Sequence, residues 1–351
     1  MSDIKPKVGF IGCGFVGGAW VSYLERERQY IRGQDFFCYD PGKNMFDDVN
    51  QANIVVISVP TPDKNGQCDL SIVYEAVARV KDGKWVVLRS TVPPGTTARL
   101  QKKYPSLYFI YIPEFLTESR AEEDFRNPDR VIIALAGTNF QIVDTLLSLF
   151  PRARTLSVPG YVDTYNWLDA TSTEAEMAKS FGNVMGAIKV TLAEIFSTDC
   201  RLLAYQLAEE GIDTRVDYDR VRKMVATDYR IGDAHLQSGH GGYRGFGGYC
   251  FIKDTYARRS AIVDRLVWVQ SLVTKCGGGR ELDKLWKLGR LLRHNVEFFD
   301  AMLASNAALL NLQGLTELEA MTHAAALSDI IKNRELKDVE DYLPETVKGG
   351  K

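Results

Sequence analysis

The sequence lacks the features that mark several protein classes. Its six cysteines have no paired spacing, which excludes a disulfide framework and indicates free thiols in a reducing compartment. Its four histidines show no metal-ligand spacing, so we predict no metal site. No apolar run reaches transmembrane length, and residues 1–7 do not resemble a signal peptide. We therefore expect a cytoplasmic protein that does not bind membranes.

The sequence also lacks an excess of either charge. Its 43 basic and 45 acidic side chains leave a net charge of −2, which gives no reason to expect a nucleic-acid partner. A hydrophobic content of 45% and a charged content of 25% are ordinary for a soluble globular protein. A length of 351 residues predicts two domains, which we place at residues 1–165 and 166–331, followed by a charged tail at 332–351.

Apolar runs rich in β-branched and aromatic residues alternate with helical stretches in the first 160 residues. This alternation predicts an α/β fold, a doubly wound Rossmann-type domain whose parallel strands are buried on both faces. The predicted strands are Val8–Ile11, Phe36–Tyr39, Ile54–Val59, Trp85–Leu88, Tyr108–Ile112, Val131–Leu135 and Thr155–Val158.

Helical spacing of apolar residues begins at Ser172 and predicts one long central helix, with a mainly helical domain after it. Thr173 and Glu176 form a candidate capping box at the start of this helix. Its apolar face fits either a dimer interface or core packing. The run Gly277–Gly279 marks a break between later helices, which we expect at Leu282–Leu292, Val296–Leu310 and Leu315–Ile331.

A glycine motif follows the first predicted strand. Gly12 permits a tight turn, Gly14 lets the backbone approach a pyrophosphate, and Gly17 allows close packing of helix and strand. The helix that follows offers its N-terminal amides to phosphates. Asp40, at the end of the next strand, is placed to bind the ribose diol and would repel a 2′-phosphate. The motif therefore predicts NAD as the cofactor.

A cysteine stands directly after a second glycine-rich segment. Cys250 follows Gly245–Gly248, and Lys253 and Asp254 come three and four residues later. A nearby cation favours the thiolate, which is the nucleophilic form of cysteine. A lone cysteine is more often a buried structural residue, but here it accompanies a cofactor motif. We therefore interpret Cys250 as a candidate nucleophile.

Three further groups of polar residues lie at informative positions. Thr91 follows a strand, so it is expected at the carboxyl edge of the sheet, where ligands bind. Glu114 and Glu118 follow the next strand at the same edge. Lys179 and Asn183 are four residues apart on the long helix and share one face. Taken separately, each group is equally typical of a solvated surface.

Together these segments resemble the UDP-glucose/GDP-mannose dehydrogenase family, from residue 7 to about residue 255. The motifs that carry the resemblance occur in the family's order: Gly12-x-Gly14-x-x-Gly17, Val59-Pro60-Thr61-Pro62, Ser90-Thr91-Val92-Pro93-Pro94-Gly95, Pro113-Glu114-Phe115-Leu116-Thr117-Glu118, Asn127-Pro128-Asp129-Arg130, the helix with Lys179 and Asn183, and Gly245 to Thr255.

The resemblance implies the oxidation of a nucleotide sugar at C6 to the uronic acid, with UDP-glucose favoured as substrate. Two hydrides pass to NAD⁺, and Cys250 holds the carbon as a thiohemiacetal and then as a thioester. Lys179 and Asn183 would stabilise the oxygen on which charge develops. The other catalytic residues that the family pattern implies are Asp254 and Thr91 for the water and the proton, and Glu118, supported by Glu114, as acid or base.

The resemblance also implies two sets of binding residues. Cofactor binding falls to Gly12, Gly14, Phe15, Val16, Gly17, Asp40, Pro60, Thr61, Thr91, Glu118 and Lys253. Substrate binding falls to Glu114, Phe115, Leu116, Lys179, Asn183, Phe246, Gly247, Gly248 and Arg230, which would come from a neighbouring subunit. The expected assembly is a homodimer formed through the central helix.

The sequence departs from the family pattern in three places. Relatives continue into a second nucleotide-binding domain, whereas only helical segments are expected here after Gly279. Ile252 stands where a proline is usual, and Thr117 where an arginine is common. These departures keep open the same chemistry on GDP-mannose or a UDP-N-acetylhexosamine, and a non-catalytic subunit that binds NAD or a sugar nucleotide. A related 3-hydroxy-acid oxidation is disfavoured because it does not use a cysteine equivalent to Cys250.

Overall fold

The computed structural model describes residues 5–137, 140–151, 166–167, 170–322 and 324–343. Backbone contacts divide the chain into two compact units, which are described separately. Unit 1 comprises Met1–Lys64 and Cys68–Phe181, and unit 2 comprises Asn65–Gln67 and Gly182–Lys351. The division falls inside the long central helix, whereas the domain boundary predicted at residue 165 lies outside the described residues.

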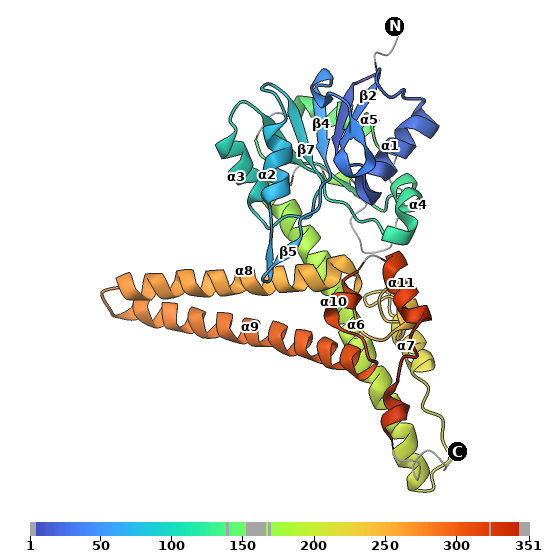
Figure 1. Cartoon of the computed structure of the whole chain (residues 1–351). Coiled ribbons are helices and arrows are strands. Elements are labelled where there is room, and N and C mark those ends of the chain that lie inside the picture. The colour runs from blue at the N-terminus through green and yellow to red at the C-terminus, as the bar shows by residue number, and fades with distance from the viewer. Residues whose placement is uncertain (1–4, 138–139, 152–165, 168–169, 323, 344–351) are drawn as a thin grey trace. The chain divides into compact units, whose positions relative to one another are not determined.

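Unit 1 is built on a seven-stranded sheet with the order β10-β8-β7-β4-β1-β2-β3 (Figure 1). Its five inner strands are parallel, and β3 and β10 pair antiparallel at the two edges. The strands are β1 (Val8–Ile11), β2 (Phe36–Asp40), β3 (Met45–Phe46), β4 (Ile54–Ile57), β7 (Trp85–Leu88), β8 (Tyr108–Tyr111) and β10 (Ala134–Leu135).

Helices cover both faces of this sheet. One face buries apolar side chains against α1 (Phe15–Arg28), α4 (Ala121–Arg126) and α5 (Val143–Ser148). The other face packs against α2 (Ser71–Ala78) and α3 (Thr96–Lys103). Strands buried on both faces explain the continuous apolar runs of the sequence. The predicted doubly wound fold is therefore confirmed.

The predicted strand Val131–Leu135 is wrong as a single element. It divides at Ile133, where the chain leaves one partner strand for another: β9 (Val131–Ile132) pairs with β11 (Asn166–Trp167), and β10 pairs with β8. A further small sheet joins β5 (Asp63–Lys64) to β6 (Gln67–Cys68). The predicted strand Thr155–Val158 lies outside the described residues.

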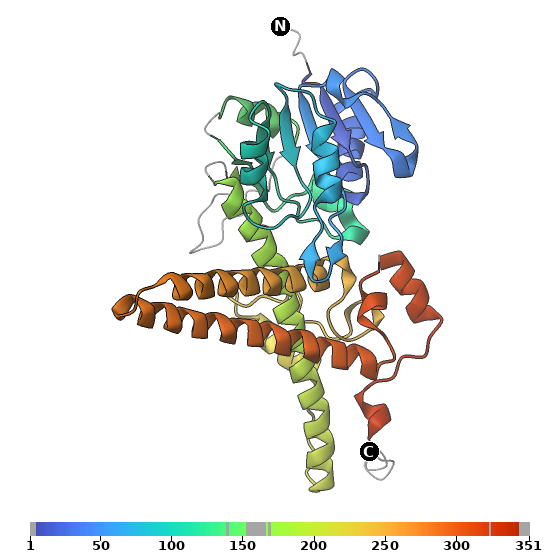
Figure 2. The same cartoon turned by 60° about the vertical axis from the view of Figure 1, so that its left-hand side comes forward.

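Unit 2 is helical. Its elements are α6 (Ser172–Glu209, which enters the unit at Gly182), α7 (Tyr218–Ala226), α8 (Gly248–Lys275), α9 (Arg280–Leu312), α10 (Glu317–Ala320) and α11 (Ala324–Lys332). Helices α8 and α9 lie antiparallel and side by side (Figures 1 and 2), and the predicted glycine break lies between them. The predicted long central helix is confirmed as α6.

One expectation for the C-terminal part differs from the structure. Helix α9 is continuous where two helices were predicted, because His294 and Asn295 are poor helix formers but not helix breakers. The first part of the predicted charged tail is held in place, since Arg334 pairs with Glu319 at 2.9 Å and Asp338 pairs with Arg244 at 2.8 Å.

The predicted capping box at the start of α6 is also wrong. Thr171 and Glu174 form it instead: the Glu174 carboxylate accepts the Thr171 N–H, and the Thr171 hydroxyl accepts the Glu174 N–H. Glu176 is fully buried and serves the N-terminus of α3, where it accepts the N–H groups of Gly95 and Thr97 and the Thr97 hydroxyl. Negative charge is favourable at that end of a helix.

We predict that Glu176→Gln lowers the free energy of unfolding by about 1–3 kcal/mol, because its amide N–H₂ would face backbone donors. Urea denaturation followed by circular dichroism measures the change. Glu174→Gln is the matched control, and it should change stability by no more than about 0.5 kcal/mol because glutamine also completes a capping box. Equal losses in both variants would contradict this role of Glu176.

Candidate active site

The glycine motif of unit 1 has the geometry that its spacing predicts. Gly12 has a φ of 85°, and a Cβ there would lie 2.4 Å from the Ser58 carbonyl oxygen. A Cβ on Gly17 would lie 2.1 Å from the Gly12 carbonyl oxygen, so α1 packs directly on the loop. A Cβ on Gly14 would meet no described atom within 4 Å. Two glycines therefore close the turn, and the third leaves open space above it.

This loop and its surroundings fit a dinucleotide. Helix α1 has Gly14 as its N-cap and no side-chain cap, so the first-turn amides, including those of Phe15 and Val16, remain for an anionic ligand. Asp40 accepts the Cys13 N–H at 2.7 Å through one carboxylate oxygen. That bond holds the acid beside the loop, and its second oxygen is placed to accept ribose hydroxyls.

Side chains join the two loops that follow β4 and β7. The Ser90 hydroxyl donates to the Val59 carbonyl oxygen at 2.8 Å and accepts the Val59 N–H at 3.0 Å. The Thr61 hydroxyl donates to the Thr91 carbonyl oxygen at 2.8 Å. Thr61 and Thr91, both predicted cofactor residues, are thereby brought together, next to the exposed Pro60. Sequence analysis missed the linking role of Ser90.

Glu114 and Lys179 form a buried ion pair in unit 1. Their side chains are each 5% exposed, and Lys179 Nζ lies 2.9 Å from Glu114 Oε1. The other Glu114 oxygen accepts the Leu116 N–H. Glu114 is therefore the partner that orients Lys179, whereas Glu118, which it was expected to support, is exposed. The Phe115 ring lies beside the pair, with its centroid 5.5 Å from Lys179 Nζ.

Cys250 is the third residue of α8 in unit 2. Gly247 is the N-cap of this helix and supplies no side-chain cap. The positive end of the helix dipole favours an anion at this position, so it favours the thiolate over the thiol. Asp254 lies four residues on and shares the face of Cys250. Unit 2 thus places a thiol and a carboxylate on one face of one helix.

The Asp254 carboxylate is held from two sides. Lys253 Nζ donates to one oxygen at 2.6 Å, and the Asn183 amide donates to the other. Asp254 and Lys253 are both almost fully buried. A Cβ on Gly186 would lie 2.4 Å from the Phe251 ring, so only glycine lets α6 approach α8 this closely. The predicted set Asn183, Lys253 and Asp254 is therefore brought together.

The loop before Cys250 is bonded to two side-chain amides, one on α9 and one at its C-cap. The Asn306 amide accepts the Phe246 N–H at 2.8 Å and donates to the Phe246 carbonyl oxygen at 3.0 Å. The Gln313 amide makes the same pair of bonds with the backbone of Arg244. A Cβ on Gly247 would collide with the Tyr243 hydroxyl. The glycines thus allow the close packing that this fixed loop requires. Sequence analysis missed both amides.

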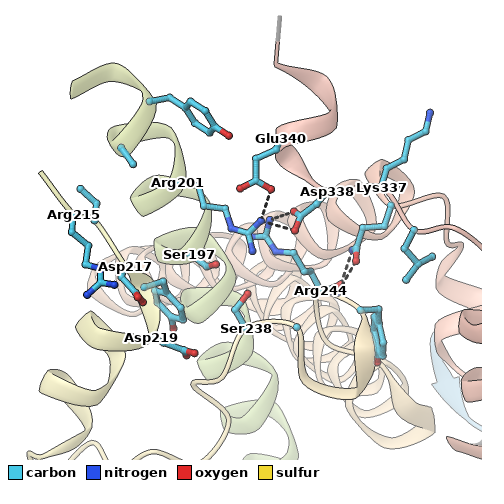
Figure 3. Close-up of a pocket in the computed structure, with 18 of the residues that line it drawn as sticks. Ser197, Arg201, Arg215, Asp217, Asp219, Ser238, Arg244, Lys337, Asp338 and Glu340 are labelled. Atoms are coloured by element: carbon cyan, nitrogen blue, oxygen red, sulfur yellow. Dashed lines mark hydrogen bonds and ion pairs between the residues drawn. The ribbon is translucent and has the colours of Figure 1, made fainter. Parts of the chain in front are cut away.

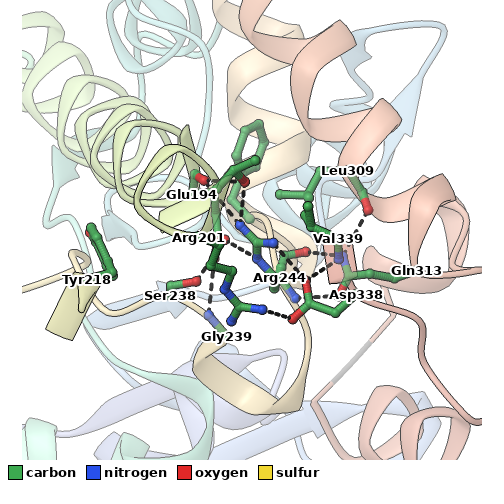
Figure 4. Close-up of polar contacts among 12 residues, drawn as sticks. Glu194, Arg201, Tyr218, Ser238, Gly239, Arg244, Leu309, Gln313, Asp338 and Val339 are labelled. Atoms are coloured by element: carbon green, nitrogen blue, oxygen red, sulfur yellow. Dashed lines mark hydrogen bonds and ion pairs between the residues drawn. The ribbon is translucent and has the colours of Figure 1, made fainter. Parts of the chain in front are cut away.

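A buried ion cluster anchors the same loop (Figure 4). Arg244 Nε donates to Glu194 at 2.7 Å, and Arg244 Nη1 donates to Asp338 at 2.8 Å. Arg201 also bonds to Asp338, at 2.6 Å. Burial disfavours the charge of Arg244, but the hydrogen bonds to Asp338 and Glu194 raise its pKa above the ordinary value. Sequence analysis missed this cluster because its members are far apart in the chain.

A cavity of about 930 Å³ adjoins the cluster (Figure 3). Arg201, Arg244 and Asp338 line it, and Arg215 and Lys337 add further charge. Its lining, within the part of the chain that the structure describes, contains none of the predicted catalytic side chains. Arg230, predicted to bind substrate, is 74% exposed and pairs with Asp228 at 2.6 Å.

Membrane-spanning helices and clusters of metal ligands are both absent from the described residues. No helix among them is long and apolar enough to cross a membrane. No group of three or more potential metal ligands occurs in the same part of the chain. All six cysteines are described, and none of them forms a disulfide.

Two family models match the chain. The NAD-binding domain of the UDP-glucose/GDP-mannose dehydrogenase family matches residues 41–150, and the central domain of that family matches residues 173–270. A UDP-glucose 6-dehydrogenase of Pseudomonas aeruginosa is 30% identical over 292 residues, which is 70% of this chain and 59% of the relative. The chain spans 46–62% of the length of four such curated relatives.

Solved structures agree with this match. A UDP-glucose dehydrogenase from Pyrobaculum islandicum is 25% identical with a TM-score of 0.53, covering 83% of this chain and 69% of that one. A UDP-D-ManNAc dehydrogenase from Pyrococcus horikoshii shares the fold at 20% identity and a TM-score of 0.54, covering 94% and 82%. The chain belongs to the UDP-glucose/GDP-mannose dehydrogenase family.

Proposed function

We propose that the chain is an NAD-dependent nucleotide-sugar 6-dehydrogenase, with UDP-glucose as its substrate. The observation that carries the proposal is Cys250 at the N-terminus of α8, one turn before an Asp254 that is held by Asn183 and Lys253. The names of the similar proteins support UDP-glucose. The absence of disulfides among the six cysteines, all of them described, supports a cytoplasmic location.

The reaction converts one primary alcohol, one water and two NAD⁺ to one carboxylate, two NADH and three protons. NAD⁺, when bound, accepts the hydride in each of the two oxidations. The Cys250 thiolate forms a C–S bond to the aldehyde carbon, which keeps the aldehyde on the protein. Water later replaces sulfur at that carbon, which regenerates the thiolate and releases the carboxylate.

The remaining residues have roles that suit their surroundings. Lys179, held by Glu114, directs an N–H at the oxygen on which charge develops, and Asn183 is a neutral donor one helical turn on. Asp254 orients the water that attacks the thioester. Thr91 and the exposed Glu118 are the candidates for proton transfer. The amides of Gly14 and Val16 bind the pyrophosphate, and Phe246–Gly248 and Arg230 contact the sugar.

Two alternatives follow the same observations. The substrate is GDP-mannose or a UDP-N-acetylhexosamine if the substrate-binding loops select a different sugar. The chain is a non-catalytic subunit if it binds NAD or a sugar nucleotide without turnover. Assays with three sugar nucleotides, together with the variant Cys250→Ala, separate these alternatives.

With limiting UDP-glucose and excess NAD⁺, we expect two NADH per sugar, measured by absorbance. Cys250→Ala removes the thiolate and should lower kcat by roughly 10³-fold or more. Cys276→Ala, just after the other end of α8, is the matched control and should keep the wild-type rate. Parallel assays with GDP-mannose and UDP-N-acetylglucosamine identify the substrate.

A yield of one NADH per sugar, or full activity in Cys250→Ala, would contradict the covalent mechanism. No turnover with any sugar, while NAD still binds, would favour the non-catalytic subunit. Binding of NAD to both cysteine variants shows that unit 1 is folded in each, and an unchanged helical circular dichroism signal shows the same for unit 2.

The Asp40 carboxylate should select NAD over NADP. Asp40→Ser should weaken NAD binding by about 10- to 100-fold, because a charged acceptor for the ribose hydroxyls is lost. The affinity for NAD should then exceed the affinity for NADP by a smaller factor than in the wild type. Calorimetric titration with both cofactors measures this. Asp48→Ser, which alters an exposed cap of a short turn, should leave both affinities unchanged. Unaltered NAD affinity in Asp40→Ser would refute the assignment.

We further propose a homodimer formed through α6. Met185, Leu192, Phe196 and Leu203 are exposed and lie within about 20° of one line along the helix, by its 3.6-residue period. A continuous apolar stripe on a helix is stabilised by burial, and two copies related by a two-fold axis can bury it mutually.

Phe196→Lys should convert the dimer to a monomer, because it places a charge at the centre of this stripe. Light scattering coupled to size-exclusion chromatography measures the mass. Phe298→Lys on α9 is the control, since the two phenylalanines have similar exposures of 55% and 52%. Loss of the dimer in both variants, or in neither, would contradict an interface on α6.

A further inference from the structure

Arg89 is a buried cation in an aromatic environment. It follows β7 in unit 1 and is 3% exposed. Its guanidinium carbon lies 5.2, 5.8 and 5.4 Å from the ring centroids of Trp20, Phe125 and Phe150. These rings face the charge from α1, α4 and the residues after α5. Cation–π attraction offsets part of the desolvation of the guanidinium but supplies no hydrogen-bond acceptor.

The hydrogen-bond donors of Arg89 find no acceptor among the described residues. Its Nε is buried and has no partner. The carboxylate that acts on it electrostatically is Glu114, which is already bonded to Lys179 and to the Leu116 N–H. Burial lowers the pKa of Arg89 to about 10, so the side chain is charged at neutral pH. A buried charge without an acceptor is strongly unfavourable.

A cavity of about 260 Å³ opens next to this guanidinium. Arg130 lines it as well, with its guanidinium stacked 3.8 Å from the Phe115 ring centroid. Burial lowers the pKa of Arg130, whereas the charge of the neighbouring Asp129 acts in the opposite direction. Arg130 belongs to the motif Asn127–Arg130, to which the proposed dehydrogenase function assigns no role.

The rest of the lining limits what this cavity accepts. Ile112, Phe115 and Leu116 are apolar and can contact the body of an organic molecule. The acidic Glu123, Asp124 and Asp129 also line the cavity, and Arg120 at its rim already pairs with two of them. The acidic groups repel extended polyanions, whereas Arg89 and Arg130 favour a single anionic group.

We propose that this cavity binds one oxyanion group, a phosphate or a carboxylate, of a small organic molecule through Arg89 and Arg130. Guanidinium groups match such anions because their planar N–H fork donates two parallel hydrogen bonds. The anion supplies the acceptor that Arg89 lacks, and the apolar lining holds the part of the molecule that carries it.

The test compares the wild type with Arg89→Met in inorganic phosphate and in benzoate, at constant ionic strength set with chloride. We expect millimolar phosphate or benzoate to raise the wild-type Tm by a few degrees, and Arg89→Met to lose this rise. Without added anion, Arg89→Met should be at least as stable as the wild type, because an uncompensated buried charge is gone. Arg79→Met is the control and should keep the rise, because Arg79 is an exposed arginine stacked on Tyr39 and lies outside the cavity lining.

Arg130→Met provides a second variant if Arg89→Met does not fold. It should raise the phosphate Kd by about tenfold or more in calorimetric titration. The proposal is wrong if Arg89→Met is destabilised while its response to both anions stays at the wild-type level. Arg89 would then be a structural residue of the aromatic cluster.

Competition identifies the source of the anion. If UDP-glucose displaces phosphate from the wild type and binds Arg89→Met more weakly, the bound group is a phosphoryl group of the nucleotide sugar. If UDP-glucose binds both proteins equally, the cavity takes a separate small anion. Each measurement is of binding alone, so the result does not depend on whether the chain turns over a sugar.

Discussion

The pairing of buried charge is the constraint on which both units depend. Removing one member of a buried pair typically lowers stability by about 3–5 kcal/mol, because the other charge is left without compensation. Glu114 with Lys179 in unit 1 and Asp254 with Lys253 in unit 2 are pairs of this kind, and they include three of the seven predicted catalytic side chains. Within each unit, the positions of these side chains are therefore set by the same interactions that let the protein bury them.

Unpaired backbone groups impose a similar constraint on the loop before Cys250. This loop has no strand partner, so its N–H and C=O groups need acceptors and donors from elsewhere. Asn306 on α9 and Gln313, the C-cap of α9, meet that need, since each amide makes two bonds with the loop backbone. The glycines of the loop allow its backbone to lie close to α9, and the two amides fix its position there through hydrogen bonds.

Much of the fold could be predicted because its signals are local. Apolar runs and Gly12 to Gly17 indicated the sheet and its cofactor loop, and helical spacing indicated α6. Features that depend on distant residues could not be predicted in this way. The role of Glu176 is set by the amides of α3, some 80 residues earlier, so the local spacing to Thr173 was misleading. Asn306 and Gln313 likewise look like ordinary helix residues until the loop is beside them.

The pairing of the lysines also limits how the proposed chemistry can work. Lys179 in unit 1 and Lys253 in unit 2 each have a carboxylate within 2.9 Å, so neither pair carries a net positive charge. Stabilisation of a developing oxyanion must then come from N–H groups directed at it, and not from an excess of positive charge. Direction requires rigidity, and a lysine side chain is flexible unless a partner holds it. In the proposed reaction, Glu114 would therefore act by fixing the direction of Lys179 and would not need to contact the reacting atoms.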